Sequence, residues 1–84
     1  MNDTMQVIII GVDREKPAII RWEGFKQILV WSQEEETPSS EIVMKEYKRI
    51  VKFPERLCNG EILLRTADYD HPDYSYTYLV KPVA

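Results

Sequence analysis

Reactive side chains are scarce in this sequence, which has one cysteine, Cys58, and one histidine, His71. One thiol cannot form an internal disulfide, which is typical of an intracellular protein. A nucleophile and its base need close geometry and usually a third residue that orients the base. No local motif suggests such an arrangement, and a phosphate-binding glycine loop is also missing. We therefore expect a protein that is not an enzyme and uses no metal or other cofactor.

A hydrophobic run of membrane-spanning length and a positive charge balance are missing too. The N-terminus lacks the basic region of a signal peptide, and no stretch approaches the roughly 20 apolar residues that cross a bilayer. The net charge is −3, which disfavours general binding to nucleic acids and anionic membranes. The sequence predicts a cytoplasmic protein that does not bind membranes.

What is present predicts a single domain, residues 1–84, because the chain is long enough for one modest core only. Continuous apolar runs at 7–10 and 28–31 predict strands that are buried on both faces. We expect strands at 5–12, 18–22, 25–31, 61–67 and 74–80. Gly24 and Gly60 mark tight turns, and the first three strands should form an antiparallel meander.

A helix is predicted between the third and fourth strands. Thr37 can cap it and Pro38 suits its first position, while Phe53-Pro54 would end it. An apolar stripe recurs at helical spacing, formed by Val43, Met44, Tyr47, Ile50 and Val51. The order β-β-β-α-β-β predicts an α+β fold, a mostly antiparallel sheet or half-open barrel of about five strands. The helix would cover one face of the sheet, and a partner would cover the other.

Tyrosines in the last predicted strand form a ladder. Tyr74, Tyr76 and Tyr78 alternate with smaller residues and share one face of the strand. Tyrosine is enriched at binding hot spots, which favours a contact surface. Aromatic rings are also common in ordinary strands, so burial of this face under the helix stays open as an alternative.

Two acidic segments are candidates for contact with a basic partner, because complementary charge raises association rates. One is the run Glu34-Glu35-Glu36, and the other spans residues 68–73. The second segment does not fit the spacing of an EF-hand loop, and turns ordinarily contain such residues. We expect no metal there.

The sequence leads to one main hypothesis: a non-enzymatic protein-binding module, such as a small adaptor, inhibitor or regulatory protein of the kind a virus or mobile element encodes. It would act through aromatic strand faces and acidic loops. The residues expected to bind the partner are Trp22, Trp31, Tyr69, Tyr74, Tyr76, Tyr78, Asp68, Asp70, Asp73, Glu34, Glu35 and Glu36.

Two alternatives stay open. The first is a nucleic-acid-binding module that contacts phosphates through the basic helix face, formed by Lys45, Lys48, Arg49, Lys52 and Arg56. The second is a structural homo-oligomer, a homodimer for instance, in which the doubly apolar strands pair across a two-fold axis. The second alternative is compatible with the main hypothesis, because a dimer can also bind a partner.

Overall fold

All of the regular structure in the described residues is β-strand. The structure is a computed structural model that describes residues 4–11 and 14–83. Its strands are β1 (Thr4–Ile10), β2 (Glu15–Glu23), β3 (Lys26–Glu36), β4 (Ile42–Arg56), β5 (Ile62–Asp68) and β6 (Ser75–Pro82). The prediction of an α+β fold with one helix is therefore wrong.

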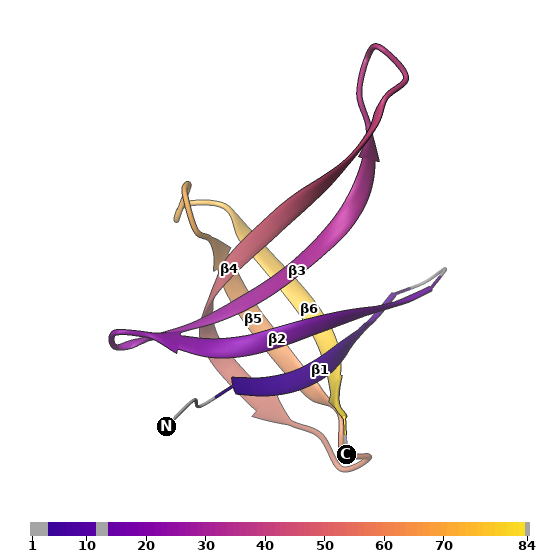
Figure 1. The fold of residues 1–84 in the computed structure, drawn as a ribbon. Helices are drawn as coiled ribbons and strands as arrows, with labels where there is room; N and C mark the ends of the chain where they lie inside the picture. Colours follow the sequence, from indigo (N-terminus) through magenta and orange to yellow (C-terminus); the bar gives the residue numbers. More distant parts are fainter. Residues whose placement is uncertain (1–3, 12–13, 84) are drawn as a thin grey trace.

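The six strands form a closed barrel in which each strand runs antiparallel to the next (Figure 1). The last strand returns to the first, since β6 pairs with β1 from Val7↔Pro82 to Ile10↔Leu79. This pairing corrects the predicted half-open barrel. Closure joins the two edges that an open sheet would leave unpaired. The predicted meander of the first three strands is confirmed.

The segment predicted as a helix is the longest strand. β4 has 15 residues and pairs with β3 on one side and β5 on the other. The supposed helical stripe includes Val43, Tyr47 and Val51, which lie four residues apart. A spacing of four places residues on one face of a strand as well as of a helix, and β-branched side chains favour the strand. The hydrogen bonds from β3 and β5 hold these residues in a strand, and the sequence pattern of residues 42–56 alone does not show them.

Thr37 and Pro38 begin a hairpin turn where a helix start was predicted. The amide of Ser40 donates to the carbonyl of Thr37 at 2.9 Å, which makes this a β-turn with Pro38 at its second position. Proline is favoured both at the second position of a β-turn and at the start of a helix, because its ring fixes φ at about −65°. Ser40 has a φ of 65°, the left-handed conformation that completes this type of hairpin.

Glycine occupies two further turns that require positive φ. Gly24 has a φ of 62° and is followed by Phe25 in the two-residue connection of β2 to β3, as in a type II′ hairpin. Gly60 has a φ of 88° and closes the turn between β4 and β5, where its amide donates to the carbonyl of Leu57 at 3.2 Å. The turns predicted at these two glycines are confirmed.

Alternate side chains of the strands fill the interior of the barrel. Six strands make a narrow barrel, so side chains meet across its axis. Tyr47, Val51 and Tyr78 are partly buried against this core. Its buried members are Val7, Ile9, Ala18, Ile20, Leu29, Trp31, Ile62, Leu64 and Val80.

A smaller apolar cluster lies on the outer face of the sheet. It consists of Ile28, Val30 and Ile50, with Ile19 packed against them. These side chains alternate with interior ones, which explains the uninterrupted apolar run at 28–31. We predicted that a helix would cover one face of these strands. No helix does so among the described residues, and Ile28 is nonetheless fully buried among its neighbours on the sheet.

β4 contains a bulge near its end. Its register with β5 shifts between Val51 and Phe53, and a bulge of this kind bends a strand. Pro54 follows the bulge and lies opposite Leu64. Proline has no amide hydrogen to donate to the ladder, so it is tolerated at bulges, where the regular hydrogen bonding is interrupted. The predicted helix end at Phe53-Pro54 therefore lies inside a strand.

Two strands continue past one end of the barrel. β2 pairs with β3 only as far as Ile19↔Val30, and β5 pairs with β4 only from Asp68↔Arg49. Residues 32–36 and 42–46 therefore pair only with each other and project from the barrel (Figure 1). We call residues 32–46 the arm. The acidic run at 34–36, which was expected to lie in a loop, belongs to strand β3.

Candidate interaction surface

The outer side of the arm exposes large apolar side chains. Ile42 is 69% exposed and Met44 is 67% exposed. Their cross-strand partners are Glu36 and Glu34, and paired residues of antiparallel strands share one face. Neither of these carboxylates forms an ion pair with a described residue. The face therefore combines two exposed apolar groups with two carboxylates that are free to meet a partner.

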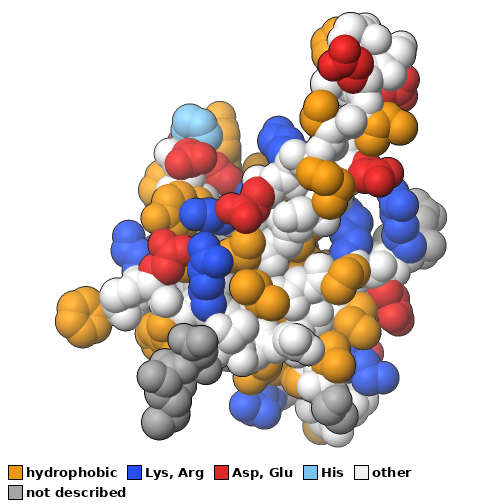
Figure 2. Space-filling view, viewed as in Figure 1, with side chains coloured by type: hydrophobic (Ala, Val, Ile, Leu, Met, Phe, Trp, Pro, Cys, Tyr) orange, Lys and Arg blue, Asp and Glu red, His pale blue; other side chains and the backbone are white. Residues whose placement is uncertain are grey.

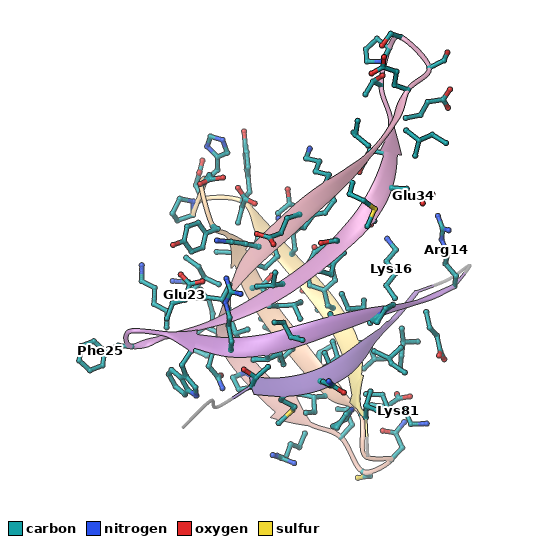
Figure 3. The ribbon with its side chains drawn as sticks, viewed as in Figure 1. Arg14, Lys16, Glu23, Phe25, Glu34 and Lys81 are labelled. Atoms are coloured by element: carbon teal, nitrogen blue, oxygen red, sulfur yellow. The ribbon has the colours of Figure 1, made fainter. Side chains whose placement is uncertain are left out.

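The inner side of the arm is anchored to the barrel. Glu35 accepts a hydrogen bond from Gln33 Nε2 at 3.0 Å and another from the Tyr47 hydroxyl. Gln33 Oε1 accepts from Lys16 Nζ of β2 at 2.7 Å. In Figure 3, Lys16 and Glu34 lie on the two sides of the gap between the β1–β2 hairpin and the arm. These contacts hold the arm beside the barrel, and Glu34 and Met44 line the gap together with Arg14 and Lys16.

The arm is a two-stranded ribbon with no neighbouring strand along most of its length. Two isolated strands are at best marginally stable in water, and unpaired strand edges attract other chains. The arm carries five glutamates and one lysine. Figure 2 shows its acidic and hydrophobic side chains next to one another. A basic partner with an apolar groove is the surface that complements this combination.

The tyrosine ladder divides between the barrel interior and its rim. Tyr78 packs against Trp31, with ring centroids 5.3 Å apart, and burial raises the pKa of its hydroxyl, an effect that the hydrogen bond from Arg49 opposes. Tyr76 lies beside Tyr78 but is more exposed. Tyr74 precedes β6 and is exposed. Burial of the ladder, the alternative interpretation, therefore applies to Tyr78. Tyr74 and Tyr76 stay candidates for contact with a partner.

Arg49 closes the arm end of the barrel. Its guanidinium forms an ion pair with Asp68 at 2.7 Å and donates to the Tyr78 hydroxyl at 3.1 Å. The ring of Tyr76 stacks on it, 4.3 Å from Cζ to the ring centroid, and Trp31 lies 5.3 Å away. The charges and hydrogen-bonding groups of these residues are paired with one another, so the cluster closes this end of the barrel from within. Asp68, a predicted partner-binding residue, is thereby engaged inside the molecule.

The remaining aromatic candidates do not form one patch. Trp31 is buried in the core, whereas Trp22 is 52% exposed near the other end of the barrel. Tyr69 lies by the outer face, where Lys48 Nζ approaches its ring at 5.2 Å and its hydroxyl donates to Glu23 at 3.3 Å. Hydrogen bonding from Arg21 is the main cause of the lowered pKa of Glu23, and desolvation opposes it.

The two acidic segments lie apart. The run at 34–36 lies on the arm, and residues 69–74 form the separate connection between β5 and β6 (Figure 1). Asp70 and Asp73 are exposed there. Among the described residues, no three or more His, Cys, Asp or Glu side chains form a group that would hold a metal ion.

The predicted basic residues do not share a helix face, because residues 42–56 form a strand. On a strand, successive side chains point to opposite sides. Lys45 and Arg49 follow the interior side of β4, and Lys48 lies on the outer side with Lys52 close to the bulge. Arg56 lies at the opposite end of the barrel from the arm.

Cys58 and His71 are far apart. Cys58 is exposed in the turn before β5, and His71 lies in the connection after it. A strand of this length spans about 20 Å, so these side chains do not form a nucleophile–base pair. None of the described residues belongs to a helix long and apolar enough to cross a membrane.

Comparison of the chain with protein-family models, with curated proteins and with solved structures found no match. The residues that sequence reasoning missed are Ile42 and Met44, because a helical pattern placed Met44 on a buried stripe. The β-branched pair at 42–43, directly after a turn, was the available signal for a strand.

Proposed function

We propose that this protein is a non-enzymatic protein-binding module and that the arm is its main contact surface. The observation that carries the proposal is the exposure of Ile42 and Met44 on a projecting ribbon. Exposed apolar groups that a barrel does not need for its own core are typical of interaction sites. Methionine is also enriched in the cores of protein interfaces.

The charges on the arm indicate the chemistry of the partner. Glu34 and Glu36 border the apolar pair on the same face. A partner with lysines or arginines around an apolar groove would pair with these carboxylates and cover the two side chains. Charges at the border of an interface mainly accelerate association, so the apolar pair would supply most of the affinity.

The same charges argue against the two alternatives at this surface. In a symmetric dimer built on the outer side of the arm, glutamates of one copy would face those of the other, because a two-fold interface uses the same patch twice. Phosphate groups of a nucleic acid would likewise be repelled. A basic protein partner would be attracted by these carboxylates, not repelled.

Quantitative capture from lysate tests the proposal. The bait proteins are the wild type, the double variant Ile42→Ser/Met44→Ser, the charge reversal Glu34→Lys/Glu36→Lys and the control Phe25→Ser. Phe25 is fully exposed on another hairpin, which makes it a matched apolar control. We expect both arm variants to lose a partner that the control retains, and the wild-type complex to weaken at high salt. Equal capture of the partner by all four baits would exclude the arm as the contact surface.

A further inference from the structure

The end of the barrel away from the arm is open. A cleft of about 620 Å³ lies there, between the start of β1 and the ends of β2 and β4. Ile20, Ile62 and Leu64 of the buried core form its floor, and Met5 and Trp22 line it. We call this the Trp22 cleft. Its volume lies within the roughly 300–1,000 Å³ typical of ligand pockets, which often occupy the mouths of barrels.

The two ends of the barrel differ in how they are closed. At the arm end, Arg49 and the rings of Trp31 and Tyr76 stack across the opening. At the other end, Trp22 is 52% exposed and Met5 is 40% exposed. Large apolar side chains that line a concave surface and stay exposed are a recognition feature, because folding gains little from leaving them in water.

Among the described residues that line the Trp22 cleft, one is charged. Arg56 lines it, and none of the ion pairs among the described residues involves this guanidinium. The other polar residues of the lining, Thr4 and Gln27, are neutral, and no described acidic residue belongs to the lining. A guanidinium beside an apolar cleft complements a carboxylate, which it can bind through two parallel hydrogen bonds.

We propose that the Trp22 cleft binds a small carboxylic acid with a planar apolar body. The apolar body would lie against Trp22 and Met5, above Leu64, and the carboxylate would pair with Arg56. Aromatic rings favour stacked or edge-to-face contact with an indole, so an aryl acid fits better than a linear chain. This site is separate from the arm and does not depend on the proposed function.

Titration of the complete protein with 4-phenylbutyrate tests the site, with 4-phenylbutanol as the uncharged analogue. We expect saturable one-to-one binding of the acid by calorimetry, accompanied by a change in tryptophan fluorescence. Trp22→Phe should abolish the fluorescence change while calorimetric binding continues. The alcohol should bind more weakly than the acid, because it makes no ion pair with Arg56.

Two arginine variants separate specific binding from general apolar adsorption. Arg56→Gln should weaken binding of the acid about tenfold and leave binding of the alcohol unchanged. Arg65→Gln is the control, because Arg65 is exposed on β5 and does not line the cleft. Arg56→Lys keeps the charge and should retain part of the affinity. Absence of saturation in the millimolar range, or equal effects of the Arg56→Gln and Arg65→Gln substitutions, would overturn the proposal.

Discussion

Arg49 and Asp68 form an ion pair inside the arm end of the barrel, with Nη1 and Oδ1 2.7 Å apart. Their side chains are only 11% and 18% exposed. The same guanidinium donates to Tyr78 and stacks on Tyr76. The pair therefore joins β4, β5 and β6 at the point where the arm leaves the barrel.

Replacement of Asp68 by Asn should lower the free energy of unfolding by about 2 kcal/mol, because it leaves a largely buried guanidinium without its counter-charge. Urea denaturation followed by circular dichroism measures this loss. Asp70→Asn is the matched control in the exposed connection that follows β5, and it should change the free energy by less than about 0.5 kcal/mol. Equal stability of the Asp68→Asn variant and the wild type would contradict the role of the pair.

Ser40→Gly should stabilise the protein. Ser40 has a φ of 65°, which costs a side-chain-bearing residue about 1 kcal/mol and glycine almost nothing. We expect a gain of about 1 kcal/mol in thermal or urea unfolding. Ser39→Gly, one residue earlier in the same turn, should give no gain. If both substitutions have the same effect, the turn does not have the described conformation.

The stability of the protein should decline at alkaline pH in a way that depends on Tyr78. Burial raises the pKa of Tyr78 above the ordinary value of 10.0, so the unfolded chain loses this proton at lower pH than the folded chain. The contribution of the protonated Tyr78 hydroxyl to the free energy of unfolding is therefore complete below the pKa of the unfolded chain. It is lost as the pH rises through the pKa of the folded state.

Absorbance titration of phenolate formation measures the effect directly. The wild type has five tyrosines, and the Tyr78→Phe variant should lack a late step that the wild type shows. Tyr74→Phe is the control, because Tyr74 is exposed, and it should retain the late step. A titration curve that is the same for Tyr78→Phe and the wild type would contradict the raised pKa of Tyr78.

Removal of the arm should leave the barrel folded. Gln33 and Lys45 are cross-strand partners, so an Asn-Gly turn can join them directly. Because most side chains removed are exposed, we expect the free energy of unfolding to change by no more than about 1 kcal/mol. Nuclear magnetic resonance spectra should retain the core signals of the wild type. A chain that unfolds on this deletion would show that the arm is part of the folding core.

The sequence predicted strands best where the signal was local. The runs at 7–10 and 28–31 and the glycine turns identified four of the six strands, β1, β2, β3 and β5, and the tyrosine ladder located β6. Residues 42–56 were assigned wrongly because apolar residues four apart fit both a helix and a strand. Thr37-Pro38 reinforced the error, since proline suits the start of a helix and a β-turn equally.

The candidate surface was harder to predict than the strands. Glu34 and Glu36 were recognised as contact residues, but their apolar neighbours Ile42 and Met44 depend on the pairing of β3 with β4. The engagement of Asp68 by Arg49 joins residues 19 positions apart. Barrel closure joins β1 with β6, near opposite ends of the chain. Long-range pairings of this kind leave no periodic trace in either segment.

Photo-crosslinking from the arm tests whether it contacts a partner protein. A benzophenone amino acid replaces Met44 in one protein and Phe25 in another, and each protein is irradiated in its source cells. We expect one dominant protein adduct from position 44, absent from position 25 and lost when Glu34→Lys/Glu36→Lys is added. Adducts of equal pattern from both positions, or none from position 44, would contradict a protein-binding role for the arm.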